Sequence, residues 1–276
     1  MKEKADSSVY LMKVQNKKAE IHVGSGTPGE EWLEDPSAYL VKRTHLELLQ
    51  LIPSRGQLIL DAGCGPGTYG IILAQEGNDV IGVEISAKAT GIAKQRADEK
   101  KAKFLPLVGD LERLPLKDNT FDTCFCGWVL HHFPDTDTSV AEIKRVLKPG
   151  GKIALAEPNE SNLAMRLSRF IEDLPLIRNW LLNAGWDTPN RTVHRHNYYV
   201  EALERHGFTD IKLSSCFPGG LPPLPIKAQT SPLRFVVLPL IHILFRLRHL
   251  VFTFAVKVSP RPLNGADLLV LGTKSE

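Results

Sequence analysis

A glycine-rich stretch directly behind a short apolar run constrains the fold of this chain more than any other feature. The segment LILDAGCGPGTYG, residues 58–70, has glycine at four positions within eight residues: Gly63, Gly65, Gly67 and Gly70. Glycine reaches backbone conformations that are closed to other residues, and it lets another group approach the main chain closely. A strand is expected to hand over to a helix here, so we expect a ligand to approach this turn.

Apolar runs of strand length alternate with helix-like segments along the chain. The expected strands are residues 58–60, 78–85, 104–108, 121–125, 152–157, 210–216 and 266–273. The expected helices are residues 69–75, a segment from Ser86 to about residue 101, and residues 137–147. Ser86 is expected to cap the second helix, and Lys148, Pro149, Gly150 and Gly151 are expected to end the third. This spacing predicts a parallel sheet with right-handed crossovers, and such sheets bind ligands at the carboxyl ends of their strands.

Composition narrows the class of protein. A chain of 276 residues with 43% hydrophobic residues fits one large domain with insertions, and 34 basic against 31 acidic residues are too balanced to indicate nucleic acid. The N-terminus lacks the apolar core of a signal peptide, so the four cysteines are expected to be reduced thiols in the cytoplasm. Cys124 and Cys126 are two residues apart, as in a strand, and no metal site is expected.

The glycine turn alone does not identify the ligand. Residues 65–70, GPGTYG, match the dinucleotide pattern G-x-G-x-x-G, which is a weak signal by itself. Glu84, at the end of the second expected strand, supplies a carboxylate for ribose hydroxyls. Both NAD and S-adenosylmethionine contain such a ribose. The alternative is a turn that only packs a helix on a strand, with Glu84 in solvent.

Five segments in order resemble the motifs of class I S-adenosylmethionine-dependent methyltransferases, in the broad group that includes the ubiquinone and menaquinone C-methyltransferases. They are LDAGCGPG, GVEIS, GDLERLPLKDNTFD, WVLHH and RVLKPGG, within about residues 46–157. The resemblance implies a Rossmann-like α/β fold of seven strands, with helices on both faces and the last strand antiparallel. It implies methyl transfer to a small, hydrophobic or lipid-like acceptor. The alternatives are an NAD(P)-dependent oxidoreductase on a similar sheet, or a protein that binds the cofactor without catalysis.

The same resemblance implies a set of cofactor contacts. They are Asp61, Gly63, Cys64, Gly65 and Gly67 at the methionine end and ribose, Glu84 at the ribose hydroxyls, Ile85 and Ser86 beside adenine, Asp110 and Leu111 at the adenine ring, and Cys126 and Gly127 beneath the methionine part. Asp110 has an alternative role as a cap on the turn that follows it.

Histidines and tyrosines after the fourth and fifth strands are candidates for contact with the acceptor. His131 and His132 lie where the family places residues near the transferred methyl group, and histidine titrates near neutral pH, so one of them is a candidate general base. Both are equally well explained as packing or helix-capping histidines. The candidate substrate contacts are His194, His196 and Tyr198, with Tyr199 beside them.

About fifty residues separate the last two expected strands, which this fold usually links closely. A proline-rich start, FPGGLPPLP, leads into an apolar segment whose longest run without Lys or Arg is Phe235–Phe245, below the ~18 residues of a spanning helix. His242, Arg246, His249 and Thr253 form one polar stripe on that apolar helix, which suits a lipid interface, a dimer interface or a lid over an apolar pocket.

The expected domain organisation follows from these segments. Residues 1–45 form an N-terminal arm, residues 46–216 and 260–276 form the methyltransferase domain, and residues 217–259 form a hydrophobic insertion. The expected partners are a small or lipid-like substrate, with peripheral membrane contact through 233–258 or a homodimer, and no nucleic acid. The expected location is the cytoplasm, or the inner face of the membrane if the insertion meets lipid.

Overall fold

A computed structural model of the chain describes residues 52, 55–133, 135–162, 166, 170, 173–175, 178, 194–216, 243, 265 and 267–275. The predicted N-terminal arm and the hydrophobic insertion fall outside these residues apart from Ile243, as does the side chain of His196. Within the described residues no helix has both the length and the apolar character needed to cross a bilayer.

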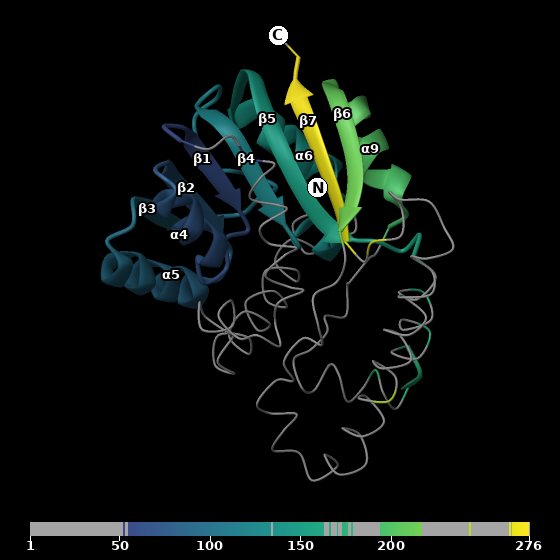
Figure 1. Cartoon of the computed structure of the whole chain (residues 1–276), viewed down its shortest axis with the longest axis horizontal. Coiled ribbons are helices and arrows are strands. Elements are labelled where there is room, and N and C mark those ends of the chain that lie inside the picture. The colour runs from purple at the N-terminus through teal and green to yellow at the C-terminus, as the bar shows by residue number, and fades with distance from the viewer. Residues whose placement is uncertain are drawn as a thin grey trace, which may run out of the picture.

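The described residues form one seven-stranded sheet (Figure 1). The strands are β1 (Leu58–Ala62), β2 (Asp79–Glu84), β3 (Phe104–Val108), β4 (Phe121–Gly127), β5 (Leu147–Pro158), β6 (Phe208–Cys216) and β7 (Asp267–Lys274). Their order in the sheet is β3-β2-β1-β4-β5-β7-β6. Strands β1 to β5 pair in parallel, whereas β7 is antiparallel to both β5 and β6. The predicted seven-stranded sheet with an antiparallel last strand is therefore confirmed.

Helices cover both faces of this sheet, as predicted (Figure 1). They are α4 (Thr68–Gln75), α5 (Ala87–Lys100), the short 3-10 helix η2 (Leu130–His132), α6 (Asp137–Val146) and α9 (His196–Arg205). Side chains of α4 and α5 belong to one buried cluster, and side chains of α6 and α9 belong to another. Alternation along β4 divides its residues between them, with Cys124 and Cys126 in the second cluster and Phe125 in the first. The two-residue spacing of these cysteines is strand alternation.

The boundaries of the helices follow local sequence signals. The Ser86 hydroxyl accepts a hydrogen bond from the Ala89 amide at 3.3 Å and caps α5, as predicted. The third predicted helix ends one position early, because Leu147 pairs with Phe121 and already belongs to β5. Strand β5 therefore starts before the Pro-Gly-Gly turn and not after it.

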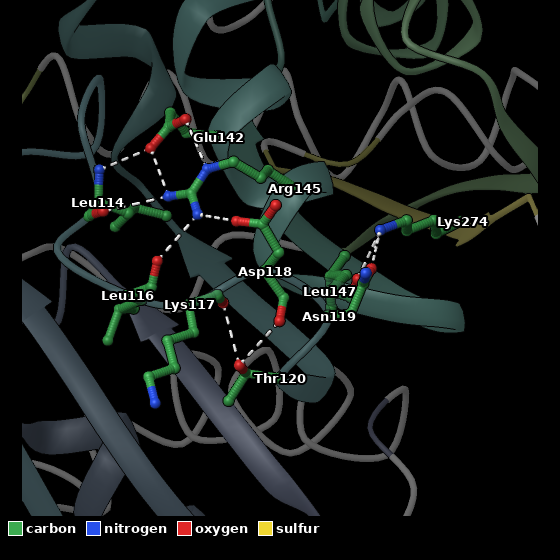
Figure 2. A network of polar contacts seen from close by, with 10 residues as sticks. All are labelled: Leu114, Leu116, Lys117, Asp118, Asn119, Thr120, Glu142, Arg145, Leu147 and Lys274. Atoms are coloured by element: carbon green, nitrogen blue, oxygen red, sulfur yellow. Dashed lines mark hydrogen bonds and ion pairs between the residues drawn. The ribbon is translucent and has the colours of Figure 1, made fainter.

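Arg145, in the last turn of α6, fixes the segment that follows β3 and its loop (Figure 2). Its guanidinium donates to both carboxylate oxygens of Glu142 and to Asp118 at 2.6 Å, and to the carbonyls of Leu114 and Leu116. Glu142 in turn accepts the Leu114 amide at 2.8 Å. A planar guanidinium with five donors suits this bidentate arrangement, so the chain between β3 and β4 is held against α6.

Candidate functional site

Four strand ends meet at one edge of the sheet. Ala62 of β1 pairs with Val83 of β2, and Gly127 of β4 pairs with Ala156 of β5, so the parallel strands end side by side. Asp61, Glu84, Gly127 and Glu157 are at or near these carboxyl ends. Open α/β sheets bind ligands at this edge, where the helices and loops leave the strands.

The glycine turn is lined mainly by protein and opens at only one glycine. Gly63, Gly65 and Gly67 all have positive φ, at 74°, 51° and 80°. A methyl group built on Gly63 would collide with Val129, and one built on Gly67 would lie 2.7 Å from the Phe104 ring, whereas nothing lies within 4 Å of one built on Gly65. We expected these glycines to leave room for a ligand. Instead, Gly63 and Gly67 leave room for neighbouring side chains, and of the three only Gly65 faces open space.

The ring of Phe104 explains three glycines, of which two lie at the start of α4 and one lies in β2. Methyl groups built on Gly67, Gly70 and Gly82 would all meet this ring at less than 3.0 Å. Phe104 begins β3 and is buried, and it belongs to the cluster beneath α4 and α5. The glycines of the turn thus let β3 pack closely against β2 and α4.

Asp61 is a buried carboxylate with one oxygen that lacks a partner among the described residues. Its exposed fraction is 2%, the backbone N–H of Gly70 donates to it, and Oδ2 has no hydrogen bond in the described part of the chain. Burial raises the pKa of Asp61 to about 7, and the charge of Glu84 adds to the rise. A buried acceptor without a donor is costly, so this oxygen has the capacity to accept a hydrogen bond from a cationic or other donor group.

Glu84 connects the glycine turn to the start of α5. Its Oε2 accepts the Gly65 amide at 3.0 Å, and its Oε1 accepts the Ser86 amide at 2.9 Å. Burial raises the pKa of Glu84, although these backbone hydrogen bonds oppose the rise. A carboxylate offers about four acceptor positions, so Glu84 retains capacity for ligand hydroxyls. Ile85 follows it and is half-buried.

Two further predicted contacts follow β3. The Asp110 carboxylate accepts the amide of Glu112 at 2.9 Å, so its turn-capping role is confirmed, while an adenine contact stays a prediction. Leu111 is buried beside it.

Cys64 and Cys126, which were predicted to contact the cofactor, are both buried. Burial raises the pKa of the Cys64 and Cys126 thiols well above the usual range, and both are buried in the core. Neither thiol is therefore suited to act as a nucleophile. Gly127 ends β4 at the edge where the ligand is expected.

A carboxylate that the sequence analysis missed organises the segment after β4. Glu157, near the end of β5, is fully buried and accepts the backbone amides of Val129, Leu130 and His131 at 3.0, 2.7 and 3.3 Å. Its Oε2 also lies 2.7 Å from Nδ1 of His131. With Glu157 as the acceptor, Nδ1 carries the proton of a neutral imidazole and Nε2 is left as the basic nitrogen.

The two adjacent histidines differ in environment. His131 has an exposed fraction of 6%, whereas His132 is half-buried. Their rings touch, with centroids 4.0 Å apart. The greater burial of His131 and its contact with Glu157 therefore distinguish it from His132.

Two of the predicted substrate contacts form an aromatic cluster at the start of α9. His194 stacks on Tyr198 with ring centroids 3.5 Å apart, and Tyr199 lies edge-on to both. The Tyr198 hydroxyl accepts a hydrogen bond from Thr136 at 3.2 Å, so the cluster adjoins the start of α6. Tyr199 is fully buried, and burial raises its pKa strongly.

Trp128 is a second feature that the sequence analysis missed. It has a positive φ of 56°, which is uncommon for a bulky residue, and its indole N–H donates to Asp267 at 3.1 Å. The indole also stacks on Tyr69 with centroids 5.9 Å apart. No pattern in the sequence indicates this conformation. Glu157 could have been found from the sequence. Among the predicted parallel strands that follow Glu84, the strand at 152–157 is the one that ends in a charged residue at the ligand-binding edge.

Comparisons with known proteins agree with this geometry. Residues 60–155 match the model of a family described as "Methyltransferase domain". A demethylmenaquinone methyltransferase from Oceanobacillus iheyensis is 36% identical over 112 residues, which are 39% of this chain and 47% of that protein. An S-adenosyl-L-methionine-dependent Diels-Alderase from Talaromyces variabilis is 32% identical over 200 residues, which are 69% of this chain and 66% of that protein.

A solved structure supports the fold. The crystal structure of a SAM-dependent methyltransferase from Thermotoga maritima superimposes with a TM-score of 0.59 at 17% identity, covering 95% of this chain and 99% of that one. At this identity the likeness concerns the fold alone. The chain spans about half the length, or less, of the first curated relatives that it matches.

Proposed function

The chain belongs to the class I S-adenosylmethionine-dependent methyltransferases, and from this premise we propose that it transfers a methyl group from S-adenosylmethionine to a small hydrophobic or lipid-like acceptor. The observation that carries the proposal is the unpartnered oxygen of buried Asp61 beside the one open glycine of the turn. An ammonium group satisfies such an oxygen, and the methionine end of the cofactor has one.

The residues at the carboxyl edge fit this cofactor. Asp61 would hold the ammonium group, Glu84 the ribose hydroxyls, and Ile85 with Leu111 the apolar surface of adenine. The open face at Gly65 leaves room for close approach to the backbone. When bound, S-adenosylmethionine supplies a sulfonium methyl group that is already a strong electrophile. Alignment of the acceptor therefore supplies much of the rate enhancement.

His131 is the proposed general base for acceptors that must lose a proton. Its Nδ1 is bound to Glu157, which leaves Nε2 to take a proton from the acceptor. Glu157 touches no reacting atom in this proposal and acts as a positioning residue. Its hydrogen bonds to the backbone of η2 fix the ring and its tautomer together.

The hydrophobic or lipid-like class of acceptor rests on two supports. A relative of this chain is named as a demethylmenaquinone methyltransferase, and menaquinones are apolar. Within the insertion, residues 235–256 have an apolar sequence with one polar stripe at helical spacing, and Arg248 alone lies off that stripe.

A second candidate function keeps the cofactor but not the methyl transfer. The relative named as an S-adenosyl-L-methionine-dependent Diels-Alderase matches more of this chain than the demethylmenaquinone methyltransferase does. In that case the site would bind S-adenosylmethionine and the acceptor would leave without a new methyl group. An oxidoreductase is disfavoured, because antiparallel β7 lies between β5 and β6 and the typical dinucleotide-binding sheet is parallel throughout.

The test is product analysis with purified full-length chain. Incubation with S-adenosylmethionine and a panel of acceptors that includes demethylmenaquinone, a soluble phenol and a small amine is followed by mass spectrometry. The proposal predicts S-adenosylhomocysteine and a methylated product with the apolar acceptors. A changed acceptor without S-adenosylhomocysteine would favour the second candidate, and methylation of the polar amine alone would contradict the proposed acceptor class.

A further inference from the structure

A basic pocket lies at the edge of the sheet opposite the proposed cofactor site. It has a volume of about 490 Å³, and five of its lining residues are basic: Lys144, Arg145, Arg205, His206 and Lys274. The pocket is formed by the last turns of α6 and α9 and by the end of β7. Lys274, which ends β7, donates to the carbonyl of Leu147, the first residue of β5, whereas Asp267, which begins β7, pairs with Pro158 at the end of β5. The pocket is therefore at the amino edge of the parallel strands.

Three of the five basic residues have carboxylate partners. Arg145 is bound by Glu142 and Asp118, and all of its N–H groups point to acceptors in Figure 2. Arg205 lies 2.7 Å from Asp137, and His206 approaches the same carboxylate at 3.4 Å. These groups shape the wall of the pocket, and most of their charge is neutralised.

The ammonium groups of Lys144 and Lys274 are different. Neither forms an ion pair with a carboxylate in the part of the chain that the structure describes. Lys274 donates to two neutral acceptors, Asn119 Oδ1 at 2.8 Å and the Leu147 carbonyl at 2.6 Å, as Figure 2 shows. An ammonium group has three donors, so one N–H of Lys274 is left for a ligand.

Lys144 lines the same pocket as Lys274. A methyl group built on Gly207 would be 2.9 Å from Nζ of Lys144, so the ammonium group is held against the end of α9. The pKa of Lys274 is lowered, first by burial and then by the charge of Lys144, while the charge of Asp118 opposes the fall. The partial negative charge of a helix C-terminus favours the cations near the ends of α6 and α9. It does not explain Lys274, which is contributed by β7.

We propose that this pocket binds the phosphate group of a small soluble molecule, with Lys144 and Lys274 as its two cationic contacts. A phosphate monoester carries nearly two negative charges at neutral pH, which matches two ammonium groups without carboxylate partners. Lysine binds phosphate as a point charge and needs no bidentate geometry. The depression at the ends of α6 and α9 is largely open to solvent, and its volume of about 490 Å³ accommodates a small ligand. The site is separate from the proposed cofactor site, so both ligands can bind to one chain.

The test uses pyrophosphate as the probe and the full-length chain at constant ionic strength. Isothermal titration of the wild type is compared with Lys144→Gln, which removes a cation that has no hydrogen bond in the described structure, and with Lys274→Gln. We expect saturable binding by the wild type and a loss in affinity of at least about tenfold in each variant, equivalent to about 1.4 kcal/mol. The matched control is Lys94→Gln, which removes an exposed charge on α5 at the other end of the sheet and should bind like the wild type.

Several results would overturn the proposal. They are the absence of pyrophosphate binding by the wild type, equal losses in Lys144→Gln and Lys94→Gln, and displacement of pyrophosphate by S-adenosylmethionine. Vesicles that contain phosphatidic acid distinguish the two sources of a phosphate group. Binding to these vesicles that depends on Lys144, with no binding of free pyrophosphate, would contradict a small soluble ligand. Thermal melts of Lys144→Gln establish that the variant is folded before its titration is compared.

Discussion

Nδ1 of His131 lies 2.7 Å from Oε2 of Glu157, and this contact joins the end of β5 to the segment that follows β4. Glu157 lies in β5, and His131 lies in η2, which follows the neighbouring parallel strand β4, so the pairing of β4 with β5 brings the two residues together. Because Glu157 is fully buried, its hydrogen bonds to the backbone of η2 are shielded from water. The pair is thus a rigid unit, and in the proposed mechanism Nε2 of its imidazole is the base.

The first prediction concerns Glu157→Gln. An amide can place its NH₂ group against Nδ1, which would favour the tautomer that has its proton on Nε2 and remove the base. We expect turnover to fall by ~10² to 10⁴, as for the loss of a general base, with little change in the dissociation constant of S-adenosylmethionine. Steady-state kinetics over a range of pH, together with calorimetric binding, measures both.

Two further variants serve as controls for this prediction. His131→Ala should cause a similar loss, and the double variant should be no worse than either single variant, because the two residues act as a unit. His132→Ala should retain most of the turnover, since it is Nδ1 of His131 that lies against Glu157, and His132 is the more exposed of the two histidines. Wild-type turnover in Glu157→Gln would show that methyl transfer depends on alignment alone.

The second prediction follows from the raised pKa of Asp61. In the folded, ligand-free protein this pKa is about 7, against an ordinary value of 3.8, so the protonated form is favoured by folding. The stabilisation that this shift contributes is complete below about pH 4 and is lost as the pH rises toward 7. In Asp61→Asn the free energy of unfolding should lack this dependence. Urea titrations between about pH 4.5 and 7.5 measure the difference, and parallel pH profiles of the two proteins would contradict it.

Asp61 also makes cofactor binding depend on pH. An ammonium group binds the ionised carboxylate, so affinity for S-adenosylmethionine should fall as the pH drops from 7.5 to about 6, and binding at the lower pH should release a proton. Calorimetry in buffers with different heats of ionisation counts that proton. The Asp61→Asn variant should bind more weakly and release none. Equal proton release by both proteins would exclude Asp61 as the titrating group.

The sequence predicts the fold in most respects and the site only in part. The order of the strands and the Ser86 cap follow from patterns within short windows, and the antiparallel last strand follows from the resemblance to the family; the structure confirms all three. The strand lengths are less accurate, since β5 begins five residues before its predicted start at Lys152. The roles of Glu157 and Trp128 depend on contacts with residues that are distant in the chain. Local sequence patterns cannot predict such contacts. The same holds for Phe104, whose ring makes glycines necessary at three separate positions.

The third prediction separates a packing glycine from a ligand-facing one. Gly70 lies within α4, where alanine is ordinarily favoured by about 1 kcal/mol, but its added methyl group would meet the Phe104 ring. We expect Gly70→Ala to destabilise the fold by ~1 to 3 kcal/mol through overpacking. A methyl group on residue 65 would lie in open space, and only the positive φ of Gly65 opposes the substitution. The Gly65→Ala variant should therefore lose mainly affinity for the cofactor. Denaturant melts and cofactor titrations of both variants test this contrast, which a larger stability loss in Gly65→Ala would contradict.

The fourth prediction concerns the insertion, whose structure lies outside the described residues. If residues 233–258 form an interfacial helix, binding to liposomes should rise with anionic lipid and fall with salt, since Arg246 and His249 meet the head groups. Replacement of Phe235–Val256 by a short Gly/Ser linker should abolish this binding. Co-sedimentation measures it, and vesicle binding that survives the replacement would contradict a membrane role. A shift from dimer to monomer on size-exclusion chromatography with light scattering would indicate a subunit interface in its place.

The most direct test of the central claim is a calorimetric titration of the full-length chain with S-adenosylmethionine and, separately, with NADH. The account predicts saturable binding of S-adenosylmethionine at one site per chain and no binding of NADH. It also predicts that Glu84→Ala weakens S-adenosylmethionine binding at least tenfold, because each charge-assisted hydrogen bond to a ribose hydroxyl contributes ~1.5 to 3 kcal/mol. Binding of NADH without S-adenosylmethionine, or an unchanged dissociation constant in a folded Glu84→Ala variant, would contradict it.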